Sequence, residues 1–301
     1  MNELDNVVIN FNSTGLIAVN AILAIVMFSI ALDLGPRDFA RLMRAPRPIL
    51  AGMTSQFIAL PAVTTLLVLL VQPQASIALG LILVASCPGG NISNFITHRA
   101  GGNAALSVSM TALATVAAIL LTPLNIAFWG RLYGPSREIL NTVEVDPVQI
   151  AITVSLMLIL PLALGMLLNS RRPALANRLR RPMQNLSMLI FFAFILLALA
   201  ANWKLFLGFA PYVGALVLLH NALALGTGYT IATLARVSPY DRRSITIETG
   251  IQNSGLGLVL IFAFFNGLGG MAVVAGIWGI WHAVSGIALA SVMARTEAAR
   301  A

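Results

Sequence analysis

Long apolar runs recur along the whole chain, and they constrain its fold more than any other feature. Stretches of 18 or more predominantly apolar residues follow one another with only short polar loops between them, and each is long enough to cross about 30 Å of hydrocarbon. Only 9% of the 301 residues are charged, against about 25% in soluble domains. Because a helix satisfies its backbone polar groups within one segment, this pattern predicts an all-α polytopic membrane protein.

The spacing of the runs predicts nine transmembrane helices within a single membrane domain that spans residues 1–301. The expected spans are 14–32, 48–71, 76–98, 104–129, 147–169, 183–201, 211–235, 244–265 and 271–293. If the loops alternate sides, 15 of the 18 basic residues lie on one side, and the other side receives only Arg131, Arg137 and Lys204. Basic loops stay cytoplasmic. We therefore expect an outside N-terminus, a cytoplasmic C-terminus and a location in the plasma membrane, with short termini that favour a bacterial inner membrane.

The net charge of +8 does not indicate nucleic-acid binding, because the basic residues form short clusters between apolar runs. Cys87 is the only cysteine, which excludes an internal disulfide. The stretch 295–301 carries no pattern of a partner-binding tail, so we expect no obligate protein partner. The expected partners are the lipid bilayer and a small ligand.

Two of the predicted spans contain polar, glycine-containing stretches in mid-membrane. The third contains CPGGNISN (residues 87–94) and the eighth contains ETGIQNSG (residues 248–255). Pro88 removes a backbone donor, and Gly89–Gly90 favour unwinding of a helix. The two stretches lie five spans apart, so they cross the bilayer in opposite directions. Paired broken helices of inverted topology are typical of the midplane binding site of secondary transporters.

Glu248 is the only acidic residue inside a predicted span, apart from positions at the membrane edge. A carboxylate at this depth is costly, so it requires a bound cation or a proton. Oxygen-bearing neighbours favour a monovalent cation: Gln252 and the Thr249 and Ile251 carbonyls adjoin Glu248. Further oxygen donors elsewhere are Gln56, Ser93, Asn94, Ser107 and Thr111. A single carboxylate among neutral oxygens suits sodium better than a divalent ion.

At these positions the chain resembles the bile acid:sodium symporter family, from about Met27 to the end of the last span. The segments that carry the resemblance are ALDLGPRDF (31–39), CPGGNISN (87–94), LSVSMT (106–111), LLHN (218–221) and ETGIQNSGL (248–256). The resemblance implies an inverted-repeat transporter fold in which two broken helices cross. The core domain would comprise about 48–129 and 211–293, and the panel domain about 14–47 and 147–210. Bacterial relatives with ten helices have one more helix before Thr14 than this chain has room for.

The resemblance also implies two sodium ions. The first site corresponds to Ser93, Asn94, Ser107, Thr111 and Glu248. The second corresponds to Gln56, Glu248, the Thr249 and Ile251 carbonyls, and Gln252. The positions that line the family's substrate cavity correspond to Asn91, Asn253 and His282. The chain has Ala283 where bacterial relatives commonly have a polar Asn, so one side chain that could bond the substrate is missing.

These features predict a sodium-coupled symporter that imports an organic anion, such as a bile acid or a small carboxylate like pantoate, by alternating access. A proton-coupled carrier or an anion exporter on the same fold is the alternative. We do not expect an enzyme, because the sequence has no H-E-x-x-H and no second deep acid for an aspartyl dyad. A channel would require rings of charge or a repeated filter, and neither pattern is present.

Overall fold

A computed structural model describes residues 21, 24–25, 27–29, 31–32, 46–90, 92–142, 147–201 and 203–298. Every regular element in these ranges is helical. The helices are α3 (Pro46–Thr54), the π-helical η1 (Ser55–Ala59), α4 (Leu60–Val71), α5 (Ala75–Ser86), α6 (Ile92–Arg99), α7 (Ala104–Gly130), α8 (Gly134–Thr142), α9 (Pro147–Arg171), α10 (Pro173–Ala201), α11 (Trp203–Leu234), α12 (Pro239–Gly250), α13 (Ser254–Phe264) and α14 (Gly269–Ala298). The prediction of an all-α protein is therefore confirmed for this part of the chain.

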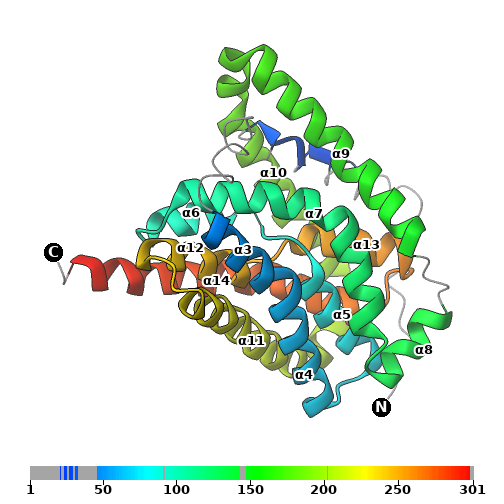
Figure 1. Cartoon of the computed structure of the whole chain (residues 1–301). Helices are drawn as coiled ribbons and strands as arrows, with labels where there is room; N and C mark the ends of the chain where they lie inside the picture. The colour runs from blue at the N-terminus through cyan, green and yellow to red at the C-terminus, as the bar shows by residue number, and fades with distance from the viewer. Residues whose placement is uncertain are drawn as a thin grey trace.

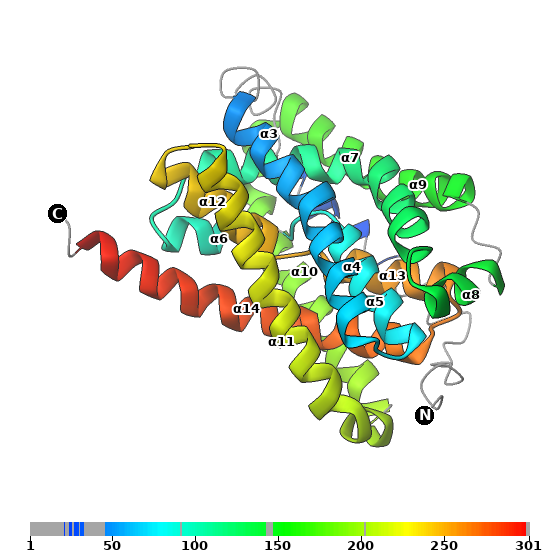
Figure 2. The ribbon, with the colours of Figure 1, turned by 60° about the horizontal axis from the view of Figure 1, so that its bottom comes forward.

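Helix α5 lies at the centre of the molecule. All of its residues are buried, as expected for a helix that is apolar on every side. Helices α14, α7 and α4 pack against it, and α11 packs along α12 and across α14, an arrangement that Figure 2 shows. Helix α9 packs on α7, and α10 on α9, at one edge of the molecule (Figure 1).

The outer surface of the helices is strongly apolar. Leu70, Leu189 and Leu234 are each about 70% exposed, and many other large apolar side chains point outward. A soluble protein rarely exposes such a surface, but a lipid-facing surface is expected to look like this. Among the described residues, four continuous helical stretches are long and apolar enough to cross a membrane: 46–71, 104–130, 208–234 and 269–295. The first predicted span, 14–32, lies mostly outside the described residues, so the count of nine remains a prediction.

Both breaks predicted from the sequence are present. Helix α5 ends at Ser86 and α6 begins at Ile92, while α12 ends at Gly250 and α13 begins at Ser254. At 1.5 Å per residue, a half-helix of 11 or 12 residues such as α5 or α13 is roughly 18 Å long, about half of the hydrocarbon core. Each broken span can therefore place its interruption near mid-membrane.

The two breaks pair with each other through their backbones. Gly89 lies opposite Gln252 in an isolated antiparallel bridge. The Gly90 N–H donates to the Ile251 carbonyl at 2.8 Å, and the Asn253 N–H donates to the Pro88 carbonyl at 2.8 Å. These bonds satisfy backbone groups that the interrupted helices leave open, and they place two segments about 160 residues apart in direct contact.

The π-helical turn η1 was not predicted, and it has a clear physical cause. In an α-helix the Phe57 carbonyl would accept from the N–H of residue 61, but Pro61 has no N–H. The Asn125 side chain of α7 donates to the Phe57 carbonyl instead, at 2.9 Å, and the Leu60 N–H bonds back to the Ser55 carbonyl. Single π turns occur frequently at functional sites, and this one carries Gln56.

Further differences from the prediction concern the starts of α10 and α11 and one additional short helix, α8. Helices α10 and α11 begin about ten and eight residues before the expected spans, because Pro173–Met183 and Trp203–Pro211 continue the helices beyond the apolar runs. The short helix α8 was not predicted, since its sequence is polar; it packs Leu140 against Gly130 and α5.

Candidate ion and substrate site

Glu248 is the centre of the candidate site. Its side chain is fully buried near the end of α12. One carboxylate oxygen accepts from the Ser93 hydroxyl at 2.6 Å and from the Ser107 hydroxyl at 2.9 Å, and the other accepts from the Thr111 hydroxyl at 2.6 Å. Within the described part of the chain, none of the groups that bond Glu248 is basic. A single buried carboxylate is thus surrounded by neutral hydroxyl groups.

The five residues predicted for the first sodium site lie together. Asn94 joins the group through its amide oxygen, which lies 2.8 Å from the Ser107 hydroxyl and 3.3 Å from the Thr111 hydroxyl. Ser107 and Thr111 share a face of α7 because they are four residues apart, and Ser93 and Asn94 come from the first turn of α6. A hydroxyl oxygen both donates and accepts, so the same side chains that bond the carboxylate can turn lone pairs toward a cation.

The second predicted set also lies at the crossing of the two breaks. Gln56 and Gln252 are both fully buried, and neither amide oxygen has a hydrogen-bond partner. A carboxamide oxygen buried without a partner costs roughly 1–3 kcal/mol, which a cation at this position would offset. The residues present therefore fit a bound sodium ion.

Gly89 lies close to Glu248 and Gln56, and its backbone pairs with Gln252. A Cβ added at Gly89 would collide with a carboxylate oxygen of Glu248 and come within 3.2 Å of the Gln56 side-chain nitrogen. A Cβ at Gly90 would approach the Gln252 carbonyl at 3.2 Å. The two glycines let the first break approach the carboxylate more closely than any other residue would allow.

Each backbone carbonyl of the second break from Thr249 to Ile251 accepts a hydrogen bond from a different residue. The Thr249 carbonyl accepts from the Gln252 side-chain amide at 2.8 Å, the Gly250 carbonyl from Asn221 at 2.8 Å, and the Ile251 carbonyl from Gly90 at 2.8 Å. A carbonyl oxygen has two lone pairs, so Thr249 and Ile251 each keep one acceptor position for a cation.

Of the three predicted substrate residues, Asn91 lies outside the described residues. Asn253 is the N-cap of α13, and its side-chain oxygen accepts from the Leu256 N–H at 3.0 Å. His282 is buried on α14 and lies beside the backbone of Gln252. Ala283 is also buried. Asn253 and His282 therefore both adjoin the second break.

The structure shows further polar groups near the site that were not among the site residues predicted from the sequence. Ser55, which precedes Gln56, is 2.9 Å from the Thr249 hydroxyl. The His220 Nε2 atom is 2.7 Å from the Thr64 hydroxyl, and its ring lies 4.8 Å from that of Trp278, which in turn faces His282. Polar residues within apolar helices could have signalled these contacts, but the hydrogen-bond partners are 194 and 156 residues apart in the sequence.

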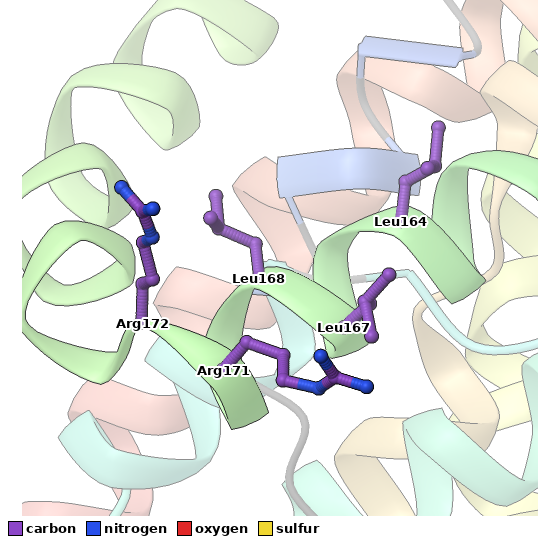
Figure 3. A pocket seen from close by; sticks show the side chains of 5 residues that line it. All are labelled: Leu164, Leu167, Leu168, Arg171 and Arg172. Carbon is purple, nitrogen blue, oxygen red and sulfur yellow. The ribbon is translucent and has the colours of Figure 1, made fainter.

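A separate surface hollow lies on α9, away from the crossing. Its volume is about 310 Å³, and Figure 3 shows the side chains that line it, which are Leu164, Leu167, Leu168, Arg171 and Arg172. It is open to the surroundings, and it includes none of the predicted ion or substrate residues.

Comparison with known proteins identifies the relatives of this chain. Residues 20–209 match the Sodium Bile acid symporter family, so the match includes the first break and ends before α12. The chain is 31% identical over 273 residues to the uncharacterized sodium-dependent transporter YocS of Bacillus subtilis (strain 168), an alignment of 91% of this chain and 82% of that protein.

Two other relatives are longer than this chain. It is 32% identical to the probable sodium/metabolite cotransporter BASS1, chloroplastic, of Oryza sativa subsp. japonica, over 88% of this chain and 63% of that protein. It is 30% identical to the human P3 protein over 73% of this chain and 45% of that protein. The chain thus spans less than two-thirds of these two relatives and about four-fifths of the bacterial one. The family match covers more than half of the sequence, and the chain belongs to the sodium bile acid symporter family.

Proposed function

We propose that this protein imports an organic anion together with sodium, by alternating access around the crossing of the two broken helices. Membership in a sodium-dependent transporter family supports sodium-coupled transport in general. The observation that carries the finer proposal is Glu248, a fully buried carboxylate at the point where both breaks, α7 and η1 converge. Its position makes it available to cations on two sides.

Two sodium ions share this carboxylate in our proposal. Ser93, Asn94, Ser107 and Thr111 would supply neutral oxygens to the first ion. Gln56, Gln252 and the Thr249 and Ile251 carbonyls would supply them to the second. Because one negative charge serves both ions, each ion favours the arrangement of Glu248 that the other needs, and their binding is expected to be cooperative.

The ends of the half-helices support an anionic co-substrate. The C-terminal ends of α5 and α12 lie at the crossing and present carbonyl groups, which favour cations, while α6 and α13 begin there with the positive ends of their dipoles. Unpaired N–H groups at a helix N-terminus form a common anion site. We therefore place a carboxylate or sulfonate of the substrate near Asn91, Asn253 and His282.

Transport then requires the crossing to face each side of the membrane in turn. We propose that residues 48–129 and 211–293 form the core domain and that 14–47 and 147–210 form a panel that rocks against it. The position of α9 and α10 at the edge of the molecule supports this division (Figure 1). Sodium binding would stabilise the crossing and so raise the affinity for the anion.

The test is the thermal stability of purified protein in detergent, with sodium chloride exchanged for potassium chloride at constant ionic strength. A ligand that binds only the folded state raises stability with its concentration. We expect a sodium-specific rise that Glu248→Gln abolishes. Equal stability in the two salts, combined with a strong dependence on pH, would replace sodium coupling with proton coupling.

A further inference from the structure

Asn221 of α11 lies outside both proposed ion sites, yet it bonds the second break directly. Its side chain is fully buried. The amide nitrogen donates to the Gly250 carbonyl at 2.8 Å, and the amide oxygen accepts from the Ser285 hydroxyl of α14 at 2.6 Å. Because a backbone carbonyl only accepts, the NH2 group must face Gly250. The orientation of the amide is therefore fixed by its partners.

Gly250 is the last residue of α12 and stands between the two residues whose carbonyls we assign to the second sodium ion. It has no side chain through which packing could hold it, and a Cβ there would collide with Leu225. The hydrogen bond from the Asn221 side chain of α11 instead fixes the Gly250 carbonyl. A rotation of the Gly250 carbonyl would turn the adjoining Thr249 and Ile251 carbonyls as well.

Ser285 links this contact to the helix that carries His282. Its hydroxyl lies 2.6 Å from Asn221 and 3.2 Å from the His282 carbonyl. Since a hydroxyl donates one proton, the shorter contact to Asn221 is the main bond. Helix α14 thus contacts the second break twice, through His282 at Gln252 and through Ser285 and Asn221 at Gly250.

We propose that Asn221 is a positioning residue for the second sodium ion and that Ser285 acts through it. Asn221 holds the end of α12 so that the Thr249 and Ile251 carbonyls face the cation. The proposal rests on the sodium sites proposed above. It assigns to the LLHN segment a role in ion affinity without direct contact with the ion.

The test is a sodium titration of thermal stability at constant ionic strength, with potassium as the exchanged cation. Asn221→Leu keeps the number of side-chain heavy atoms and removes both hydrogen bonds. We expect it to raise the apparent sodium dissociation constant about five- to tenfold, as expected for the loss of one or two buried hydrogen bonds.

Ser285→Ala is the milder variant, with an expected two- to threefold effect. The double variant should bind sodium no more weakly than Asn221→Leu, because Ser285 acts through Asn221.

Matched controls separate positioning from general stability. Thr227→Val on α11 and Ser291→Ala on α14 each remove a hydroxyl that bonds only its own helix. They should change the melting temperature in potassium without changing the sodium dissociation constant. If Asn221→Leu and Ser285→Ala bind sodium as tightly as the wild type, this assignment is wrong and the proposed function stands. If the wild type shows no sodium response, both are wrong.

Discussion

At the scale of single residues, the proposed sodium coupling depends on one carboxylate, Glu248, that serves two groups of oxygens. Ser93, Ser107 and Thr111 bond Glu248 directly, whereas Gln56 and Gln252 are buried with unpartnered amide oxygens. The two groups come from different helices, so substitutions can affect them separately.

The two sodium sites should be separable by counting bound ions. We expect the wild type to bind two sodium ions in equilibrium binding of radioactive sodium, Thr111→Val and Gln56→Leu to bind one each near physiological sodium, and Glu248→Gln to bind none. Glu138→Gln is the matched control, because Glu138 is exposed on α8. Two ions retained by Glu248→Gln would exclude the shared carboxylate.

Gly89 offers a second test at this scale. Gly89→Ala should weaken sodium binding roughly five- to 150-fold, because the added methyl group would meet the Glu248 carboxylate and overpacking of this kind costs about 1–3 kcal/mol. Gly226→Ala on α11 meets nothing within 4 Å and should stabilise the protein by up to about 1 kcal/mol. Wild-type sodium affinity in Gly89→Ala would show that the close approach does not matter for the ion.

At the scale of elements, the π turn η1 sets the position of Gln56. It exists because Pro61 cannot donate to Phe57 and because Asn125 does so from α7. Asn125→Ala should destabilise the protein by about 1–3 kcal/mol, since it leaves a buried carbonyl without a partner, and it should also lower sodium affinity by displacing Gln56.

The control combines Asn125→Ala with a second substitution that provides a backbone N–H donor for the Phe57 carbonyl. In the Asn125→Ala background, Pro61→Ala supplies an N–H at position 61 and should recover most of the stability in a thermal melt. If the double variant is no more stable than Asn125→Ala, the proline is not the cause of the π turn.

The breaks were predictable from sequence because their causes are local. Pro88 with Gly89–Gly90, and Gly250 with the polar residues beside it, disfavour a continuous helix wherever they occur. The grouping of Ser107 with Thr111 was predictable for the same reason, as helical spacing places them on one face. The other oxygen-bearing residues of the ion site were also candidates from the sequence, but their division into two sodium sites and the choice of the substrate residues came from the family resemblance.

The π turn, the Ser55–Thr249 contact and the Asn221–Gly250 bond were not predictable. Each joins residues 68, 194 or 29 positions apart and depends on how the helices pack. Pro61 alone looks like an ordinary proline of a membrane helix. Its link to the π turn is recognised only from the Asn125 bond to the Phe57 carbonyl.

At the scale of the whole molecule, the proposed function requires that an ion gradient drive the movement of a second solute. The outward-facing leucines place the helices in a bilayer, and the half-helices α5, α6, α12 and α13 place their ends at one crossing. In the proposed function, cations and an anion would bind there together, because carbonyl ends and N–H ends of helices meet at the same point.

The most direct test of the central claim is uptake of a radiolabelled organic anion into proteoliposomes that contain the purified protein. Pantoate and taurocholate represent the small and the steroidal substrate. An inward sodium gradient should drive accumulation of at least one of them above its external concentration, whereas an equal potassium gradient, or the Glu248→Gln variant in sodium, should not. Accumulation that is the same in sodium and potassium would contradict sodium coupling through Glu248.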